Sequence, residues 1–345
     1  MKNGDDLKIL PLDQLPDWDG FVESHMKGTI FHTSAMIRTM KSAKGHRPFA
    51  HAAVDENGAI CAMLVAVKVS TLGRWADRIA ARSILYAEPI FLESLQGRTG
   101  VAQLLRHHDN YMRRRTLFAE VRPFFEAPVS EDALLNQGYE LLGYYNYELD
   151  LRSSEEQLFM GLDPKCRNNI RSSMRRGLIV REVEPLSELN RFYSIVSESY
   201  AGSKVPLADR SLFESAFREM PHSICRVFFA EYEGDVAAAA CFLAYKHRVV
   251  YWYAGAKRIQ GISAMSMILW EAMLKYSIEG YRLFDFAGAG WEGEEYGPGK
   301  FKAKFGGDLT NFGRYRKVYS PWKLRCASSA YKLMRGWISP SVQSR

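Results

Sequence analysis

Short apolar runs separated by tight turns recur along the first half of the chain. Residues 49–54 form an apolar run that is typical of a strand. Residues 55–58 end in an Asn-Gly pair, which favours a hairpin turn. The apolar run at 59–69 then returns as a second strand. A helix is expected around 101–115, and another strand at 116–121.

The second half repeats this order of elements. Its predicted elements are strands at 225–231, 236–245 and 249–253, a helix around 264–279 and a strand at 283–286. The repeat lies in the order of the elements rather than in residue identity. We therefore predict an α+β fold that contains two copies of one domain.

The expected junction between the copies lies near residues 149–162. Ser153-Ser154-Glu155-Glu156 is a good helix start, because a serine cap is followed by acidic residues in the first turn. We accordingly expect one domain at 1–152, a second at 153–317 and a tail at 318–345.

The composition limits the kinds of partner, metal site and location that the protein can have. The 345 residues are 47% hydrophobic, which is enough for substantial cores. The net charge of +7 favours anionic partners but is too small to indicate nucleic-acid binding. The five cysteines are scattered without metal-ligand spacing, so we expect reduced thiols and no metal site. The polar N-terminus and the lack of a long apolar run predict a cytoplasmic protein.

A basic helix is predicted between Pro164 and Gly177. Arg167 and Arg171 share one of its faces, and each guanidinium can bind two phosphate oxygens at once. A solvated basic face is the other interpretation, and the helix alone does not decide between them.

A loop with phosphate-binding character follows the strand at 249–253. It contains Arg258 and Gly261 and leads into a helix, whose first N–H groups can bind an anion. The loop resembles the pyrophosphate loop of GCN5-related acetyltransferases, with Ser263 where that pattern has Gly or Ala. An ordinary connecting loop is the alternative.

Two further segments carry candidate chemistry. Asp285 ends a buried strand, where it could orient a substrate amine or cap the strand end. The run at 297–307 puts three lysines and two phenylalanines between glycine pairs. Pro298 before the lysines and Gly306-Gly307 after them favour a short helix over a strand. Phe301 and Phe305 would then form the anchor, with Lys302 and Lys304 on either side of it.

Taken in order, several segments resemble the FemAB/FemX family of peptidyltransferases, which have two GNAT-like domains. The similar segments are 31–36, 138–151, 165–170, 252–256, 284–286 and 301–306. Met36 stands where the family has an aromatic residue, and the family's long helical insertion is not visible.

The resemblance implies roles for individual residues. Lys302 would contribute to the transfer step, and Lys165 and Arg167 would bind the phosphates of the precursor. The wider set of implied or candidate substrate-binding residues adds Arg171, Tyr253, Asp285 and Lys304. A fixed cation suits this reaction, because an amine that attacks an ester or thioester generates an oxyanion. No side-chain nucleophile is needed once the acceptor amine is positioned.

The resemblance also frames the substrates. It implies acyl or aminoacyl transfer to an amine of a phosphorylated or lipid-linked envelope precursor of the peptidoglycan type, with donor and acceptor held in a cleft. The donor could be aminoacyl-tRNA or acyl-CoA, the latter bound by Arg258, Gly261 and Ser263. A CoA-dependent N-acyltransferase that acts on an amino sugar or other envelope precursor stays open. So does an inactive binding protein of the same fold.

The tail contains a predicted basic amphipathic helix. Leu324, Ala327, Tyr331, Met334 and Ile338 line one side of it, with basic residues around them. Such a helix suits the inner membrane surface, where a lipid-linked acceptor would be found. Packing on the first domain is the alternative.

Overall fold

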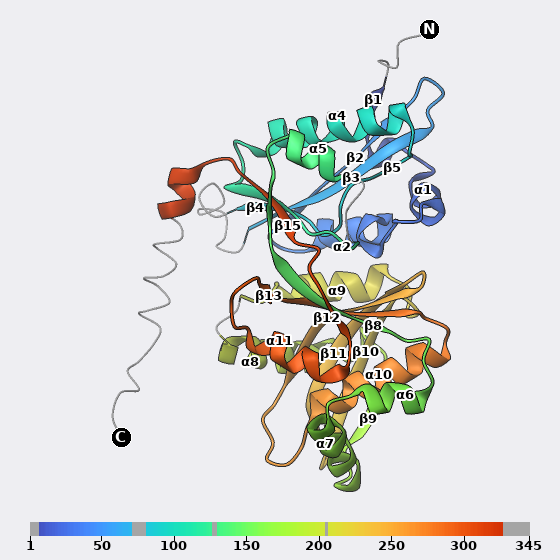
Figure 1. Ribbon diagram of the computed structural model, residues 1–345, viewed down its shortest axis with the longest axis vertical. Helices are drawn as coiled ribbons and strands as arrows, with labels where there is room; N and C mark the ends of the chain where they lie inside the picture. Colours follow the sequence, from blue (N-terminus) through green and yellow to red (C-terminus); the bar gives the residue numbers. More distant parts are fainter. Residues whose placement is uncertain (1–6, 71–80, 126–129, 204–205, 327–345) are drawn as a thin grey trace. The chain divides into compact units, whose positions relative to one another are not determined.

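A computed structural model describes residues 7–70, 81–125, 130–203 and 206–326. Contacts divide the chain into two units (Figure 1). Unit 1 comprises Met1–Phe21, Gly45–Leu141 and Arg314–Arg345, and unit 2 comprises Val22–Lys44 and Leu142–Gly313. This grouping differs from the boundaries expected at 152 and 317, because each unit takes in a segment that is distant in sequence. The helix predicted in the tail lies mostly outside the described residues, of which 321–326 are helical.

Unit 1 is built on one sheet, with strand order β1-β2-β3-β4-β6-β15-β7 and β5 beside β3. Helix α4 (Leu95–Met112) packs against β2 and β3, and α5 (Glu131–Asn136) packs against α4. The other elements are β1 (Lys8–Pro11), η1 (Leu12–Gln14), α1 (Trp18–Ser24, which continues into unit 2), β2 (His46–Val54), β3 (Ile60–Val69), β4 (Arg82–Leu85), β5 (Ile90–Phe91), β6 (Phe118–Val121), β7 (Glu140–Leu142) and β15 (Arg314–Val318).

Local sequence explains the main elements of unit 1. The predicted hairpin turn has Gly58 at φ 84°, a left-handed conformation that favours glycine. Helix α4 buries Val101, Leu104, Leu105 and Met112, the spacing of a single apolar face. These side chains join the core under β2 and β3.

Unit 2 carries a second sheet with strand order β14-β8-β13-β12-β11-β10-β9. Its strands are β8 (Tyr144–Asp150), β9 (Ile179–Val183), β10 (Cys225–Tyr232), β11 (Asp235–Tyr245), β12 (Arg248–Ala256), β13 (Leu283–Trp291) and β14 (Asp308–Thr310). All pairs are antiparallel except β12 with β13.

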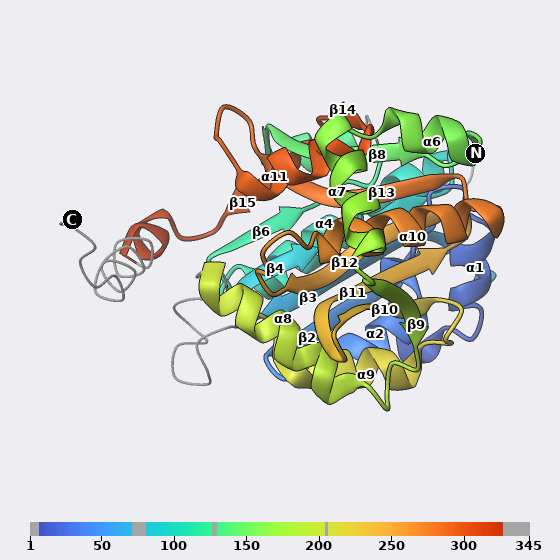
Figure 2. The same cartoon turned by 90° about the horizontal axis from the view of Figure 1, so that it is seen from below.

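The helices of unit 2 pack on this sheet or on one another. They are η2 (Ile30–His32), α2 (Ser34–Ser42), α6 (Glu155–Gly161), α7 (Pro164–Arg175), α8 (Leu189–Ser203), α9 (Arg210–Glu219), α10 (Ala264–Ile278), α11 (Gly297–Lys302) and η3 (Ala303–Phe305). Helix α10 lies against β10, β11 and β12 and beside α7 (Figure 2). Helix α8 approaches β12 closely, since a Cβ added to Gly255 would lie 2.6 Å from the carbonyl oxygen of Ile195.

Candidate functional site

The site of interest in unit 2 begins where the two parallel strands separate. Strands β12 and β13 pair only from Arg248 opposite Leu283 to Val250 opposite Asp285, although both strands continue well beyond these residues. The register of β12 against β11 shifts between Cys241 and Phe242, at the same level. Ligands in open sheets often bind beyond the carboxyl ends of parallel strands, and this is such a position.

A bulge in β13 marks the same level. Ala287 has φ 57°, a left-handed conformation that is uncommon for a residue with a side chain. The Oδ1 atom of Asp285 accepts a 2.7 Å hydrogen bond from the N–H of Ala287 and so stabilises the bulge. At the next residue, the Gly288 carbonyl accepts a hydrogen bond from Lys302 Nζ at 2.8 Å.

Lys302 is the buried cation of this site. It ends α11 and is only 9% exposed, and Phe301 and Phe305 on either side pack with ring centroids 5.3 Å apart. Burial lowers the pKa of Lys302 to about 8, against an opposing effect of Asp285. Its Nζ lies 5.9 Å from the centre of the Tyr251 ring. The residue is therefore a cation at neutral pH that titrates close to the physiological range.

Asp285, whose charge acts on Lys302, belongs to a cluster of two carboxylates and one arginine. Arg248 Nη1 donates to Glu148 Oε1 at 2.7 Å and to Asp285 Oδ2 at 2.9 Å. Glu148 and Asp285 are opposite each other on the antiparallel strands β8 and β13. Burial and the Asp285 charge raise the pKa of Glu148 to about 7, although Arg248 opposes this. Glu148 and Arg248 were not predicted as site residues. Glu148 lies in the similar segment 138–151 at a position that the family pattern leaves open, and Arg248 lies in none of the similar segments.

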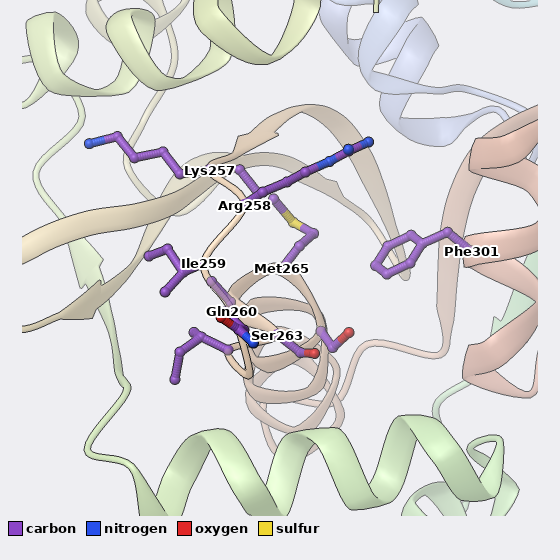
Figure 3. A pocket seen from close by; sticks show the side chains of 11 residues that line it. Lys257, Arg258, Ile259, Gln260, Ser263, Met265 and Phe301 are labelled. Atoms are coloured by element: carbon purple, nitrogen blue, oxygen red, sulfur yellow. The ribbon is translucent and has the colours of Figure 1, made fainter. Parts of the chain in front are cut away.

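A pocket of about 500 Å³ lies at the start of α10 (Figure 3). The loop side chains of Lys257 and Arg258, the first turn of α10 and Phe301 line it. Figure 3 shows Phe301 extending from α11 towards Met265 of α10. Tyr251 connects this pocket with Lys302, because its hydroxyl donates to Met265 Sδ at 3.2 Å while its ring faces Nζ.

The predicted phosphate loop is at the pocket, and α7 packs against it. Gly261 has φ 76°, and a Cβ added there would lie 2.7 Å from Nη1 of Arg176. The N–H of Ser263 donates to the buried hydroxyl of Ser173 at 2.9 Å. Arg258 and Ser263 line the pocket. The N–H of Ser263 is therefore already paired and is not available to an anion bound at the loop.

The basic helix makes internal contacts. Arg167 Nη1 donates to the carbonyl oxygens of Met160 and Leu162 at 2.5 and 2.6 Å, at the end of α6. The Arg171 guanidinium lies 4.9 Å from the centre of the Phe159 ring. These contacts give both arginines structural partners, while Lys165 is exposed at the start of α7.

The remaining predicted residues lie at different places in unit 2. Lys304 is exposed, and its carbonyl accepts a 2.9 Å bond from the N–H of Asp163, next to α7. The Tyr253 ring packs edge-on against Phe213 of α9 at 4.8 Å. Lys302 and Asp285 thus lie together, whereas Tyr253 belongs to an aromatic cluster with α9.

Unit 1 contains a separate polar cluster. The hydroxyl of Ser83 lies 2.8 Å from His108 Nε2, and His108 Nδ1 lies 3.2 Å from Asp109 Oδ1. Ser83 and His108 are 0% exposed, so no substrate can reach them in this conformation. Asp109 also accepts hydrogen bonds from Tyr139, Lys317 and Tyr319. This cluster is structural and joins β15 to α4.

The described part of the chain offers neither a metal site nor a membrane-spanning helix. It contains no group of three His, Cys, Asp or Glu side chains that could hold a metal ion. None of its helices has the length and apolar character required to cross a bilayer. All five cysteines are free, and only Cys326 is exposed.

Known proteins share this fold. Residues 164–300 match the family model described as an acetyltransferase (GNAT) domain. The structure of FemX superposes with a TM-score of 0.67 at 13% identity, over 90% of this chain and 97% of that one. The structure of L-PGS from Bacillus licheniformis superposes with a TM-score of 0.56 at 14% identity, over 88% of this chain and 90% of that one. No curated protein sequence matches the chain.

A tandem GNAT protein from the clavulanic acid biosynthesis pathway also superposes, with a TM-score of 0.53 at 13% identity over 92% of this chain and 99% of that one. The FemX-like α+β fold of two GNAT-like domains, each with a mainly antiparallel sheet and flanking helices, is thereby confirmed. At these identities the similarity establishes the fold.

Proposed function

We propose that the protein is an acyltransferase that transfers an aminoacyl or acyl group to an amine of an envelope precursor of the peptidoglycan type. The observation that carries this proposal is Lys302, a buried ammonium in a GNAT-like domain, next in sequence to Phe301, which lines the pocket. The similarity to FemX and L-PGS supports aminoacyl transfer, and the GNAT family match supports acyl transfer.

The proposed chemistry needs a cation rather than a nucleophile. The acceptor nitrogen attacks the carbonyl carbon of the donor, a C–N bond forms, and the C–O or C–S bond to the carrier breaks. The nitrogen loses a proton and the departing oxygen or sulfur gains one. In between, the carbonyl oxygen carries negative charge, which an ammonium in a dry site stabilises. Lys302 uses one of its three N–H donors on Gly288 and has no other hydrogen-bond partner among the described residues.

The donor has two candidates. Aminoacyl-tRNA follows from the resemblance to FemX. Acyl-CoA is favoured by the pocket at Arg258, where Lys257 and Arg258 have no ion-pair partner in the described part of the chain and could bind a diphosphate. In the second case the protein would be an N-acyltransferase that acts on an amino sugar or other envelope precursor. A phosphorylated or lipid-linked acceptor suits both.

Mass spectrometry of two parallel reactions distinguishes the donors. One contains precursor and acyl-CoA, and the other contains precursor and charged tRNA. Product from acyl-CoA alone would exclude the tRNA hypothesis, and product only with charged tRNA would exclude the CoA hypothesis.

Lys302→Ala tests the catalytic assignment. We expect the rate of product formation to fall by about 10²–10³-fold, the range for loss of one oxyanion-stabilising group. Lys300→Ala on the same helix is the matched control, because Lys300 is exposed and pairs with Glu295. An unchanged rate in folded Lys302→Ala would refute the role of Lys302, whereas a wild-type protein that forms no product with either donor would favour an inactive binding protein.

A further inference from the structure

The position of Lys302 depends on the bulge in β13. The carbonyl of Gly288 can accept from Nζ because the strand departs from regular pairing with β8 between Asp285 and Gly288. A left-handed backbone at Ala287 is unfavourable for a residue with a Cβ and persists only where the surroundings support it. The described contact that supports it is the hydrogen bond from the Ala287 N–H to Asp285 Oδ1.

The carboxylate of Asp285 is itself fixed. Its other oxygen, Oδ2, accepts from Arg248 Nη1, and the same nitrogen binds Glu148. Asp285 is 2% exposed, so neither oxygen is available to a substrate without rearrangement. The prediction that Asp285 contacts substrate is therefore less well supported by this geometry than an indirect role.

We propose that Asp285, held by Arg248 and Glu148, is a positioning residue for Lys302. It fixes the bulge that presents the Gly288 carbonyl to Nζ, and it supplies the negative charge that stabilises the ammonium. Only the catalytic consequence of this arrangement rests on the proposed function.

The balance of charges supports this role. The groups around Nζ are Asp285, the Tyr251 ring and the Gly288 carbonyl, with Arg248 and Glu148 behind Asp285. Burial disfavours the ammonium, and Asp285 is the charge that opposes this effect. Tyr251 stays neutral because burial raises its phenol pKa. Removal of the Asp285 charge would therefore leave the effect of burial on the ammonium unopposed.

The pKa of Lys302 can be measured without any substrate. The Cε resonance of ¹³C-labelled lysine is followed against pH and assigned by its absence in Lys302→Arg. In the wild type we expect a midpoint near 8. Asp285→Asn retains an oxygen for the Ala287 N–H but removes the charge, so we expect the midpoint to fall by about one unit. Glu295→Gln, which alters the exposed partner of Lys300, is the control and should leave the midpoint unchanged.

A second variant tests the supporting pair. In Glu148→Gln, Asp285 is the one remaining carboxylate of the pair that binds Arg248, so Arg248 offsets more of the Asp285 charge. We therefore expect the midpoint of Lys302 to fall, but by less than in Asp285→Asn. If both variants fold and both retain the wild-type midpoint, the proposal is wrong. If Asp285→Asn is poorly folded, Glu148→Gln alone decides, and an unchanged midpoint there overturns the proposal.

The two proposals can fail separately. A shifted midpoint in a protein that forms no acyl product would retain the positioning role of Asp285 and refute the proposed function. If the midpoint is unshifted in Asp285→Asn and Glu148→Gln, but the wild type is active and Lys302→Ala is not, the positioning role of Asp285 is refuted and the proposed function is retained.

Discussion

At the scale of single residues, burial moves the pKa values of Glu148 and Lys302 towards each other. Desolvation disfavours the charged form of each, so it raises the pKa of the acid to about 7 and lowers that of the base to about 8. Both then titrate near neutral pH, a property that is frequent at functional sites. Arg248, which pairs with both Glu148 and Asp285, opposes the rise in the pKa of Glu148.

The raised pKa of Glu148 makes stability depend on pH. The folded protein binds this proton more tightly than the unfolded chain does, so its stabilising effect is full below about pH 4.5 and is lost as the pH rises through about 7. We expect the free energy of unfolding of the wild type, relative to Glu148→Gln, to fall by about 3 kcal/mol between pH 4.5 and 8. Urea denaturation of both proteins at several pH values measures this. A constant difference would show that Glu148 is not perturbed.

At the scale of elements, the arginine row of α7, which suggested phosphate binding, also makes structural contacts. Asp163 caps the helix through the N–H groups of Lys165 and Cys166, and Pro164 is its first residue, as expected from the sequence. The arginine row lies on this helix, yet Arg167 binds the last carbonyl groups of α6. A cation at a helix C-terminus is stabilising in its own right.

Arg167→Ala should therefore destabilise unit 2 even without substrate. We expect a loss of about 2 kcal/mol, as for hydrogen bonds from a charged donor. Lys165→Ala is the matched control, since Lys165 is exposed on the same turn and should change stability by less than about 0.5 kcal/mol. Thermal or urea unfolding gives both values. Equal stability of the two variants would restore a purely substrate-binding interpretation of Arg167.

At the scale of the whole molecule, the two units are interleaved in sequence. Strand β15 completes the sheet of unit 1 beside β6, although it follows all of unit 2 in the chain. Tyr315 on β15 is 1% exposed, and Lys317 pairs with Asp109 of α4. Val22–Lys44 conversely belongs to unit 2, where Arg38 pairs with Glu219 of α9.

Truncation tests this arrangement. A chain that ends at Gly313 lacks β15, and we expect hydrogen exchange to show loss of protection in β6 and α4 while β10 and β11 stay protected. A chain that ends at Ser320 retains β15 and Tyr319 and serves as the control. Protection of β6 in the shorter chain would contradict the contribution of β15 to unit 1.

The sequence by itself determined the features that depend on neighbouring residues. The hairpin at Gly58, the Ser154 cap, the Pro164 helix start and the short helix before Gly306 all follow from local backbone preferences, and each is present. The order of these elements also indicated two copies of one α+β domain, and the resemblance to the FemAB/FemX family implied that both are GNAT-like.

Only the tertiary structure decided how the candidate site is assembled. Arg248 is 100 residues from Glu148 and 37 from Asp285, and strand pairing brings all three together. Their effect on Lys302 depends on distance and burial, which no local pattern encodes. The same applies to Arg167, whose partners are set by how α6 meets α7. The sequence, through its family resemblance, therefore pointed to Lys302, and the tertiary structure determined the groups that surround it.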